Sequence, residues 1–450
     1  MPEDKDLFLA EKEAARNHIK EQVAEYYRRF VKDEGEFEPG DRIPYSGRVF
    51  DEKEMENLVD SALDFWLTAG RFSLEFVKKF GEYVGAEYVS IVNSGSSANL
   101  LAFMALTSHE LGDRRIKKGD EVITVACGFP TTVAPIMQYG AVPVFVDVTI
   151  PQYNIDVSRL EEALSDKTKA VMIAHTLGNP FDIATVKKFC KAHDLWLVED
   201  TCDALGTEYT LDGKKGFAGT FGDIGTASFY PPHHITMGEG GAVFTNDPLL
   251  HRIVRSFRDW GRECVCPPGC DNYCGHRFDG QFGDLPVGYD HKYVYSHLGY
   301  NLKATDMQAS IGCAQMDKLP EFTRARRKNW QHLRQLLSDL SDIFILPEVC
   351  PDSEPSWFGF VLTMKEEGVR NSVTSFLEKN NIQTRLLFSG NIIKHPCFKE
   401  YEEGRDYRVV GDLSATDKVM NDTFWIGVYP GLSGQKIEYM SEILHKAVRR

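Results

Sequence analysis

The stretch SFYPPHHITMGEGGAVF, residues 228–244, decides the fold, because two short apolar runs flank a turn that carries paired histidines. Ser228 ends the first run, and the glycine-rich turn GEGG leads into the second. Short apolar runs that are bounded by Gly, Pro, Asn or Asp are typical of strands covered on both faces. His233 and His234 therefore follow a buried strand, at the kind of position where α/β sheets bind their ligands.

The same pattern of short, bounded apolar runs extends through most of the chain. Seven runs predict strands: YVSIV (88–92), EVITVA (121–126), VPVFVDV (142–148), AVMIAH (170–175), LWLVED (195–200), ASFY (227–230) and GAVFTN (241–246). Helical stretches such as residues 98–112 and 183–194 alternate with them, which predicts a mostly parallel α/β sheet. We expect an N-terminal helical arm (1–50), a large domain (51–318) with a cysteine loop at 262–290, and a small α+β domain (319–450).

Composition excludes several classes of partner. The chain has 450 residues and a formal net charge of −15, so nucleic acid is not an expected partner. A phosphorylated substrate remains compatible, because helix N-termini and local Arg or Lys bind phosphate whatever the total charge. The N-terminus has no signal-like apolar segment and no uncharged run of 18 apolar residues occurs, so we expect a cytoplasmic protein without membrane contact. In that reducing compartment the ten cysteines are not expected to form disulfides.

Polar or aromatic residues follow several of the predicted strands. Ser94, Ser96 and Ser97 open a helix after the first strand, where they form either an anion cradle or a simple helix cap. Phe129 is either a core residue or a platform for a flat ligand. Asp200 ends a buried strand, and a buried carboxylate needs a partner such as a protonated ring nitrogen.

These features, in this order, resemble the site of fold-type I pyridoxal-phosphate enzymes, and more narrowly the DegT/DnrJ/EryC1/StrS family of nucleotide-sugar aminotransferases and dehydratases. The likeness rests on residues 65–72, 93–100, 129–148, 174–180, 198–206, 228–244 and 297–312. It implies a pyridoxal-type cofactor whose pyridine nitrogen pairs with Asp200 and whose ring stacks on Phe129. It further implies a homodimer and a phosphate held by these residues: Ser96, Ser97, Ser228 and, from the neighbouring subunit, Asn301.

His233 occupies the place where aminotransferases of the family carry the lysine that binds the cofactor covalently. Imidazole forms no stable Schiff base, but it moves protons near neutral pH. The resemblance therefore implies non-covalent pyridoxamine 5′-phosphate with His233 as the base, as in the branch that removes the C3 hydroxyl of 4-keto-6-deoxy nucleotide sugars. The alternative is that His233 is a packed bystander, and we expect His234 to be a structural neighbour.

The loop GRECVCPPGCDNYCGHRF (261–278) distinguishes between branches. Cys264, Cys266 and Cys274, with Cys202 upstream, resemble the four-cysteine [2Fe-2S] motif of the 3,6-dideoxysugar branch in lipopolysaccharide O-antigen synthesis. That likeness implies CDP-4-keto-6-deoxy-D-glucose as the substrate and an NAD(P)H-dependent iron–sulfur flavoprotein reductase as a partner. The alternatives are that Cys270 replaces Cys202, or that zinc binds the loop cysteines.

Two other functions remain compatible with the sequence. One is a dTDP-sugar 3-dehydratase of an antibiotic pathway, and the other is a catalytically silent, zinc-binding member of the family with a regulatory role. Arg385, in TRLLFSGN, is a candidate contact for a substrate phosphate, with a surface salt bridge as the alternative.

Overall fold

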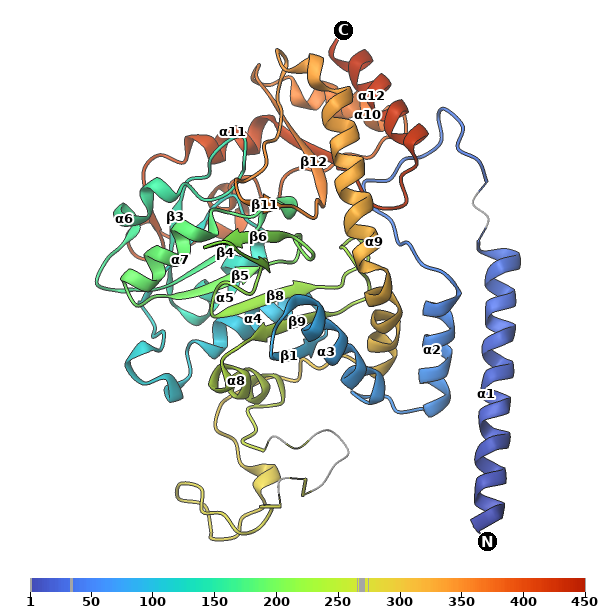
Figure 1. Cartoon of the computed structure of the whole chain (residues 1–450). Coiled ribbons are helices and arrows are strands. Elements are labelled where there is room, and N and C mark those ends of the chain that lie inside the picture. The colour runs from blue at the N-terminus through green and yellow to red at the C-terminus, as the bar shows by residue number, and fades with distance from the viewer. Residues whose placement is uncertain (1, 33–34, 265, 267–271, 274, 450) are drawn as a thin grey trace.

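The computed structural model describes residues 2–32, 35–264, 266, 272–273 and 275–449, and its centre is an eight-stranded sheet (Figure 1). The strand order is β1-β9-β8-β5-β4-β2-β3-β13. Its strands are β1 (Tyr88–Val92), β2 (Glu121–Val125), β3 (Val142–Val146), β4 (Thr168–Ala174), β5 (Trp196–Asp200), β8 (Ile224–Ser228), β9 (Gly241–Thr245) and β13 (Arg408–Val409). All neighbours pair in parallel except β9, which is antiparallel to both β1 and β8. The prediction of a mostly parallel α/β sheet is confirmed.

Helices cover both faces of this sheet, which explains why its strands read as nearly continuous apolar runs. The α-helices of the described residues, on this sheet and elsewhere in the protein, are α1 (Pro2–Phe30), α2 (Glu52–Asp64), α3 (Arg71–Val84), α4 (Gly95–Ala105), α5 (Pro130–Tyr139), α6 (Leu160–Ala163), α7 (Ile183–Ala192), α8 (Pro248–Arg258), α9 (Asp306–Leu336), α10 (Arg370–Lys379), α11 (Ser414–Asp422) and α12 (Gly434–Val448). Helices α4 and α8 pack on one face, while α7 packs on part of the other face and α3 and α9 on the rest. Among the described residues, no helix combines the length and the apolar character that a membrane span requires.

The C-terminal part of the chain forms a second core around a three-stranded sheet of order β10-β12-β14. Its strands are β10 (Phe344–Ile345), β12 (Gly359–Met364) and β14 (Thr423–Gly427). A small separate sheet joins β6 (Glu208–Leu211), β7 (Lys214–Phe217) and β11 (Ser353–Glu354). Helix α9 runs from α3 to α12, so the boundary expected at residue 318 falls inside this helix (Figure 1). The division into domains stays a prediction.

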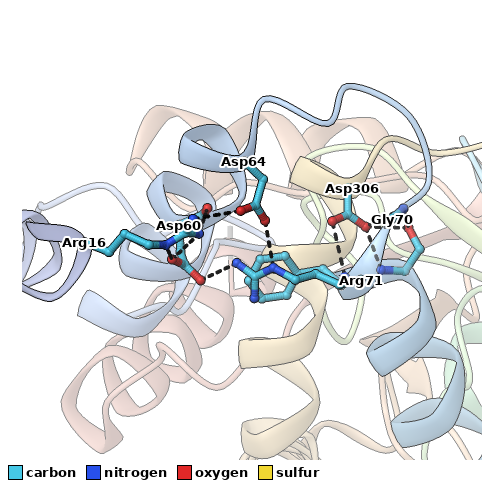
Figure 2. A network of polar contacts seen from close by, with 8 residues as sticks. Arg16, Asp60, Asp64, Gly70, Arg71 and Asp306 are labelled. Atoms are coloured by element: carbon cyan, nitrogen blue, oxygen red, sulfur yellow. Dashed lines mark hydrogen bonds and ion pairs between the residues drawn. The ribbon is translucent and has the colours of Figure 1, made fainter. Parts of the chain in front are cut away.

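A network of two arginines and two aspartates fixes the long N-terminal helix α1 to the body of the protein (Figure 2). Arg16 of α1 lies 2.7 Å from Asp60 and 2.8 Å from Asp64, both on α2. Arg71, at the start of α3, contacts the same two carboxylates at 2.5 and 2.7 Å. Each aspartate therefore meets two guanidinium groups, and this pairing outweighs burial and lowers the pKa of both carboxyls.

Asp306, at the first turn of α9, caps the N-terminus of α3 (Figure 2). Its Oδ1 accepts hydrogen bonds from the backbone N–H groups of Gly70 and Ser73, both at 2.8 Å. The side chain is 1 % exposed, and the backbone N–H of Phe72 donates to its Oδ2. Because a carboxylate at a helix N-terminus satisfies N–H groups that have no partner in the helix, this contact fixes α3 relative to α9.

His297 anchors the segment that joins α8 to α9 and carries Cys264 and Cys266. Its ring is buried, with Nε2 2.8 Å from Ser108 Oγ and Nδ1 2.8 Å from Ser256 Oγ. The ring also packs on Phe257 with the centroids 4.4 Å apart. Both ring nitrogens therefore have a hydroxyl partner, and Oε1 of Glu110 lies 3.8 Å from Nε2. In Figure 1 the described parts of this segment, coloured yellow, extend beyond α8, away from the central sheet.

The buried ring of His297 predicts that the folded protein loses stability at low pH. Burial lowers the pKa of His297 from 6.5 to about 4. An unfolded chain takes up this proton first, so the contribution of His297 is complete above about pH 6.5 and is lost as pH falls towards about 4. We expect His297→Gln to flatten the pH dependence of the melting temperature in that interval, measured by differential scanning calorimetry. An unchanged slope would show that the ring is not held in its neutral form.

Candidate active site

A cavity of about 500 Å³ lies at the carboxyl ends of β4, β5 and β8. Of the residues selected from the sequence, those that line it are Ser94, Ser96, Phe129, Asp200, Cys202, Ser228, His233 and Arg385. This is the place where open α/β sheets bind ligands, and the volume suits a cofactor together with part of a substrate. Ser97, Asn301, Cys264 and Cys266 are not among the lining residues.

One end of the cavity is formed by the N-terminus of α4. Ser94 caps this helix by accepting a hydrogen bond from the N–H of Ser97, whose hydroxyl donates to Asn93 at 2.6 Å. Ser96 instead is exposed and lines the cavity, while Ser228, at the end of β8, is buried in the cavity wall. A Cβ at Gly95 would lie 2.4 Å from the Cβ of Ser228, so only glycine allows this approach. The cap and the anion cradle are therefore both present, with the serines divided between them.

Asp200 is held rigidly at the floor of the cavity. Its Oδ2 accepts hydrogen bonds from Asn99 Nδ2 at 2.7 Å and from Thr132 Oγ1 at 2.8 Å. The N–H of Cys202 donates to Oδ1 at 3.1 Å. Asn99 is oriented in turn by Thr226, whose hydroxyl donates to its Oδ1 at 2.7 Å. Asp200 is 3 % exposed, and hydrogen-bond donors surround both oxygens of its carboxylate.

Phe129 precedes α5 and has 51 % of its surface exposed, although the residues before it, 121–128, are buried. An apolar ring that lines a cavity without being packed into the core is free to stack on a flat ligand. The alternative of a core residue is therefore wrong for Phe129.

The two side chains that donate to Asp200, Asn99 and Thr132, were not selected from the sequence, although Asn99 lies within the motif NSGSSANL.

His233 enters the cavity from the turn between β8 and β9. Its Nε2 lies 3.3 Å from Oδ1 of Asp203, and its ring packs edgewise on Tyr230 and Phe358 with centroids 5.7 and 5.3 Å apart. Burial raises the pKa of Asp203, an effect that the neighbouring His233 ring partly offsets. No lysine is among the described residues that line the cavity. Asp203 completes a histidine–carboxylate pair that the sequence analysis missed.

His234 turns away from the cavity into the protein. Its Nε2 donates to the carbonyl oxygen of Ser356 at 2.8 Å, and its ring is 2 % exposed. Burial, with the nearby Arg326 guanidinium, holds the pKa of His234 well below its usual value, so the ring is neutral.

Arg326 of α9 is also buried and donates to the carbonyl oxygens of His233 and Trp357. The indole of Trp357 stacks on Trp330 with centroids 4.2 Å apart and planes at 3°.

The outer wall of the cavity comes from the N-terminal segment and the C-terminal part of the chain. The guanidinium of Arg385 lies 3.9 Å from the ring centroid of Tyr45, and Tyr45 contacts Trp425 edge to face. Nη1 of Arg385 donates to the carbonyl of Thr384, and no ion pair of Arg385 with a carboxylate is found among the described residues. The salt-bridge alternative is therefore not found in the described structure, and the cation faces the cavity.

The cysteines selected as metal ligands are divided between two regions. Cys202 lines the cavity, two residues beyond Asp200, and burial and the Asp200 carboxylate hold the pKa of its thiol well above the usual value. Cys264 and Cys266 are half-buried in the segment after α8, while Cys270 and Cys274 lie outside the described residues. Within the described ranges, no three His, Cys, Asp or Glu side chains are grouped so as to hold a metal.

Asn301 lies at the end of the same segment, outside the cavity of its own chain. It is exposed and accepts a hydrogen bond from Lys303 Nζ at 2.6 Å. Its backbone pairs with Asp259, which closes the base of the segment. An approach of Asn301 to the phosphate end of a second copy stays a prediction.

Comparisons with known proteins agree with this geometry. The chain is 53 % identical over 430 residues to the lipopolysaccharide biosynthesis protein RfbH of Salmonella typhimurium, which covers 94 % of this chain and 97 % of the relative. It is 49 % identical over 407 residues to dTDP-4-dehydro-2,6-dideoxy-D-glucose 3-dehydratase of Saccharopolyspora spinosa, covering 90 % and 86 %.

Among solved structures, GDP-4-keto-6-deoxy-D-mannose-3-dehydratase of E. coli with bound hydrated PLP superposes with a TM-score of 0.79. The two are 29 % identical, and the match covers 90 % of this chain and 99 % of that one. Residues 49–445 match the DegT/DnrJ/EryC1/StrS aminotransferase family, which includes the cavity-lining residues discussed above except Tyr45. With the fold, the cavity and these relatives in agreement, the chain belongs to the DegT/DnrJ/EryC1/StrS aminotransferase family.

Proposed function

We propose that the protein is a pyridoxamine 5′-phosphate-dependent 3-dehydratase, which removes the C3 hydroxyl of a nucleotide-linked 4-keto-6-deoxyhexose. The observation that carries this proposal is His233, which faces the cavity beside Asp203 where no lysine is present among the lining residues. A site with a proton-transfer group and no amine nucleophile suits a cofactor that is bound non-covalently. The names of the relatives from Saccharopolyspora spinosa and E. coli, both 3-dehydratases, support the same reaction class.

The residues of the cavity fit this cofactor. When bound, pyridoxamine phosphate supplies the amine that condenses with the C4 ketone and the conjugated ring through which electrons expel the C3 hydroxyl. Asp200 would hold the protonated ring nitrogen, Phe129 would cover one face of the ring, and Ser96 and Ser228 would bind the phosphate with the N-terminus of α4. His233 would take a proton at Nε2, and the Asp203 carboxylate would stabilise the imidazolium that results.

The substrate is proposed to be CDP-4-keto-6-deoxy-D-glucose, with its diphosphate near Arg385. The lipopolysaccharide role in the name of the Salmonella relative supports a dideoxysugar of a surface polysaccharide. Mixing the protein with CDP-, dTDP- and GDP-linked 4-keto-6-deoxyhexoses tests this choice. Preference for the dTDP sugar would instead assign the protein to an antibiotic-type pathway, in line with the relative from Saccharopolyspora spinosa.

We further propose a [2Fe-2S] cluster on Cys202, Cys264, Cys266 and Cys274, which an NAD(P)H-dependent iron–sulfur flavoprotein reductase would reduce, in a homodimer completed by Asn301 of each subunit. The place of Cys202 beside Asp200 supports a cluster close enough to the cofactor to pass electrons to it.

Iron and sulfide analysis after anaerobic purification tests the cluster. We expect about two irons and two sulfides per chain, with reddish-brown absorption. Cys266→Ser should abolish this absorption and the reduced product while leaving proton exchange on the cofactor, and Cys270→Ser is the matched control that should retain the cluster. Zinc without sulfide, or bleaching by Cys270→Ser, would contradict the proposed ligand set, and zinc together with absent proton exchange would favour a silent regulatory protein.

A further inference from the structure

A second, much smaller cavity lies against the paired histidines. Its volume is about 10 Å³, and its wall includes His233, His234 and Arg326. The other residues that line it are Gly47, Arg48, Val49, Pro231, Thr236, Gln315, Phe322 and Pro430. His233 thus borders both cavities, and it separates this small space from the candidate active site.

Three buried nitrogen atoms of these residues have no protein partner in the described structure. They are Nδ1 of His233, Nδ1 of His234 and Nε of Arg326. Buried polar atoms in native proteins are nearly always paired, either with protein or with ordered water. Three orphaned atoms on residues that share one cavity therefore point to a polar molecule inside it.

The size and the hydrogen-bonding character of the cavity fit one water molecule. A cavity holds a water when it has about 10–15 Å³ for it and offers two to four polar partners. Nε of Arg326 is a permanent donor. His234 uses its Nε2–H on the Ser356 carbonyl, so in its neutral ring Nδ1 is an acceptor. A donor and an acceptor that do not meet directly need a molecule that both accepts and donates.

We infer that this cavity binds one structural water that bridges Nδ1 of His233, Nδ1 of His234 and Nε of Arg326, and that His234 and Arg326 position the His233 base through it. The function given to the water rests on the proposed role of His233, whereas the binding site itself does not. The inference also explains why the sequence carries two adjacent histidines, one for proton transfer and one that faces the protein interior.

The water gives Nδ1 of His233 a partner in every protonation state of the ring. Nε2 can accept a proton only when it is bare, and the single ring proton then sits on Nδ1 and needs an acceptor. The water accepts it, accepts a second hydrogen bond from Arg326, and donates to His234. When Nε2 takes up a proton, Nδ1–H stays on the water and the new Nε2–H points to Asp203, so no other bond changes.

Two substitutions at His234 separate the bond to the water from the bond to Ser356. Glutamine places its amide near the Nε2 position, so His234→Gln can retain the Ser356 contact but lacks the acceptor at Nδ1. Asparagine places its amide oxygen near the Nδ1 position, so His234→Asn keeps an acceptor for the water and loses the Ser356 contact. A variant of the half-exposed His193, His193→Gln, controls for the loss of a histidine elsewhere.

The test combines high-resolution crystallography with ¹⁵N NMR of the imidazole nitrogens, both on the full chain without cofactor. We expect density for one water in hydrogen-bond contact with the three nitrogens in the wild type and in His234→Asn, but not in His234→Gln. The ¹⁵N shifts of the His233 ring should change in His234→Gln only. Proton exchange on added pyridoxamine phosphate should then fall by about tenfold or more in His234→Gln, as when an outer partner of a functional histidine is lost.

Absence of the water in the wild type, or unchanged His233 shifts in His234→Gln, would overturn the inference. If His234→Gln does not fold, Val49→Ile is the second variant, because an added methyl group can fill the cavity without removing a polar partner. Displacement of the water in Val49→Ile with a change in the His233 shifts supports the bridge to Nδ1, and displacement with unchanged shifts would overturn it. Wild-type protein that holds the water but shows no proton exchange would refute the proposed function and retain the water site.

Discussion

Replacement of His233 by asparagine is expected to slow proton exchange at the C4′ carbon of bound pyridoxamine phosphate by about 10²- to 10⁴-fold, the usual contribution of a positioned general base. The reason is geometric: His233 lines the cavity beside Asp203, with Nε2 3.3 Å from Oδ1 of that carboxylate. An amide neither takes up nor returns a proton near neutral pH. Cofactor affinity should change little, because His233 is not among the groups that hold the phosphate or the ring nitrogen.

Solvent deuterium exchange followed by mass spectrometry of the released cofactor measures this rate without any sugar substrate. His193→Asn is a suitable control, because this half-exposed ring lies on the surface beside Glu161. Exchange that survives in His233→Asn would remove His233 from its role as the base. The candidate would then be Asp203, whose carboxyl lines the same cavity and has a raised pKa.

Asp200→Asn is expected to have the second large effect, on binding of the cofactor. Loss of one partner of a buried, hydrogen-bonded charge pair costs about 2–5 kcal/mol, so the Kd for pyridoxamine phosphate should rise by about 30- to 5000-fold. In either orientation the NH2 group of the new amide also faces a native donor, either Asn99 and Thr132 or the backbone N–H of Cys202. Loss of the charge and the conflict between donors both weaken binding of the cofactor in Asp200→Asn.

Isothermal titration with the cofactor, accompanied by a thermal melt, measures the effect. Asp203→Asn is the matched control, because it removes a carboxylate from the same cavity and leaves the proposed partner of the ring nitrogen in place. If both variants weaken binding equally, the net negative charge of the cavity, and not a contact with Asp200, would explain the affinity.

The sequence predicted those features that depend on neighbours along the chain. Strand β5 is uniformly buried, and the apolar run at 195–200 predicted it directly. The run at 227–230 located β8 less accurately, because that strand is Ile224–Ser228 and only its last two residues belong to the run. Because the carboxyl ends of neighbouring parallel strands meet at one edge, Asp200 and Ser228 could be assigned to one site before the structure was known. His233 followed from its fixed offset from Ser228 within a resemblance to a family.

Contacts between distant parts of the chain were out of reach. Asn99 reaches Asp200 across 101 positions, and Arg326 reaches His233 across 93. Arg326 lies in the basic run RARR (324–327), whose composition indicates a solvated surface. The position of Arg326 relative to its neighbours would have indicated its burial more reliably. Phe322, Arg326 and Trp330 follow one another at the helical interval of four, and all three are buried.

Asp203 was missed for a related reason. Asp203 follows Cys202, and this segment was selected only for the Cys202 thiol. The sequence does not reveal that the Asp203 carboxylate lies beside a histidine 30 positions later. Pairing of a carboxylate with a base depends on how two turns approach each other in space, and no local pattern encodes that approach.

The stacked pair Trp330 and Trp357 gives this site an optical label of its own. Two parallel indoles 4.2 Å apart couple their electronic transitions, which produces a circular dichroism couplet that single tryptophans lack. The carbonyl of Trp357 is tied to Arg326, and the next residue, Phe358, packs on His233 and lines the active cavity. Occupation of the cavity can therefore be followed spectroscopically with unlabelled protein, and Trp330→Phe identifies the contribution of the pair among the six tryptophans.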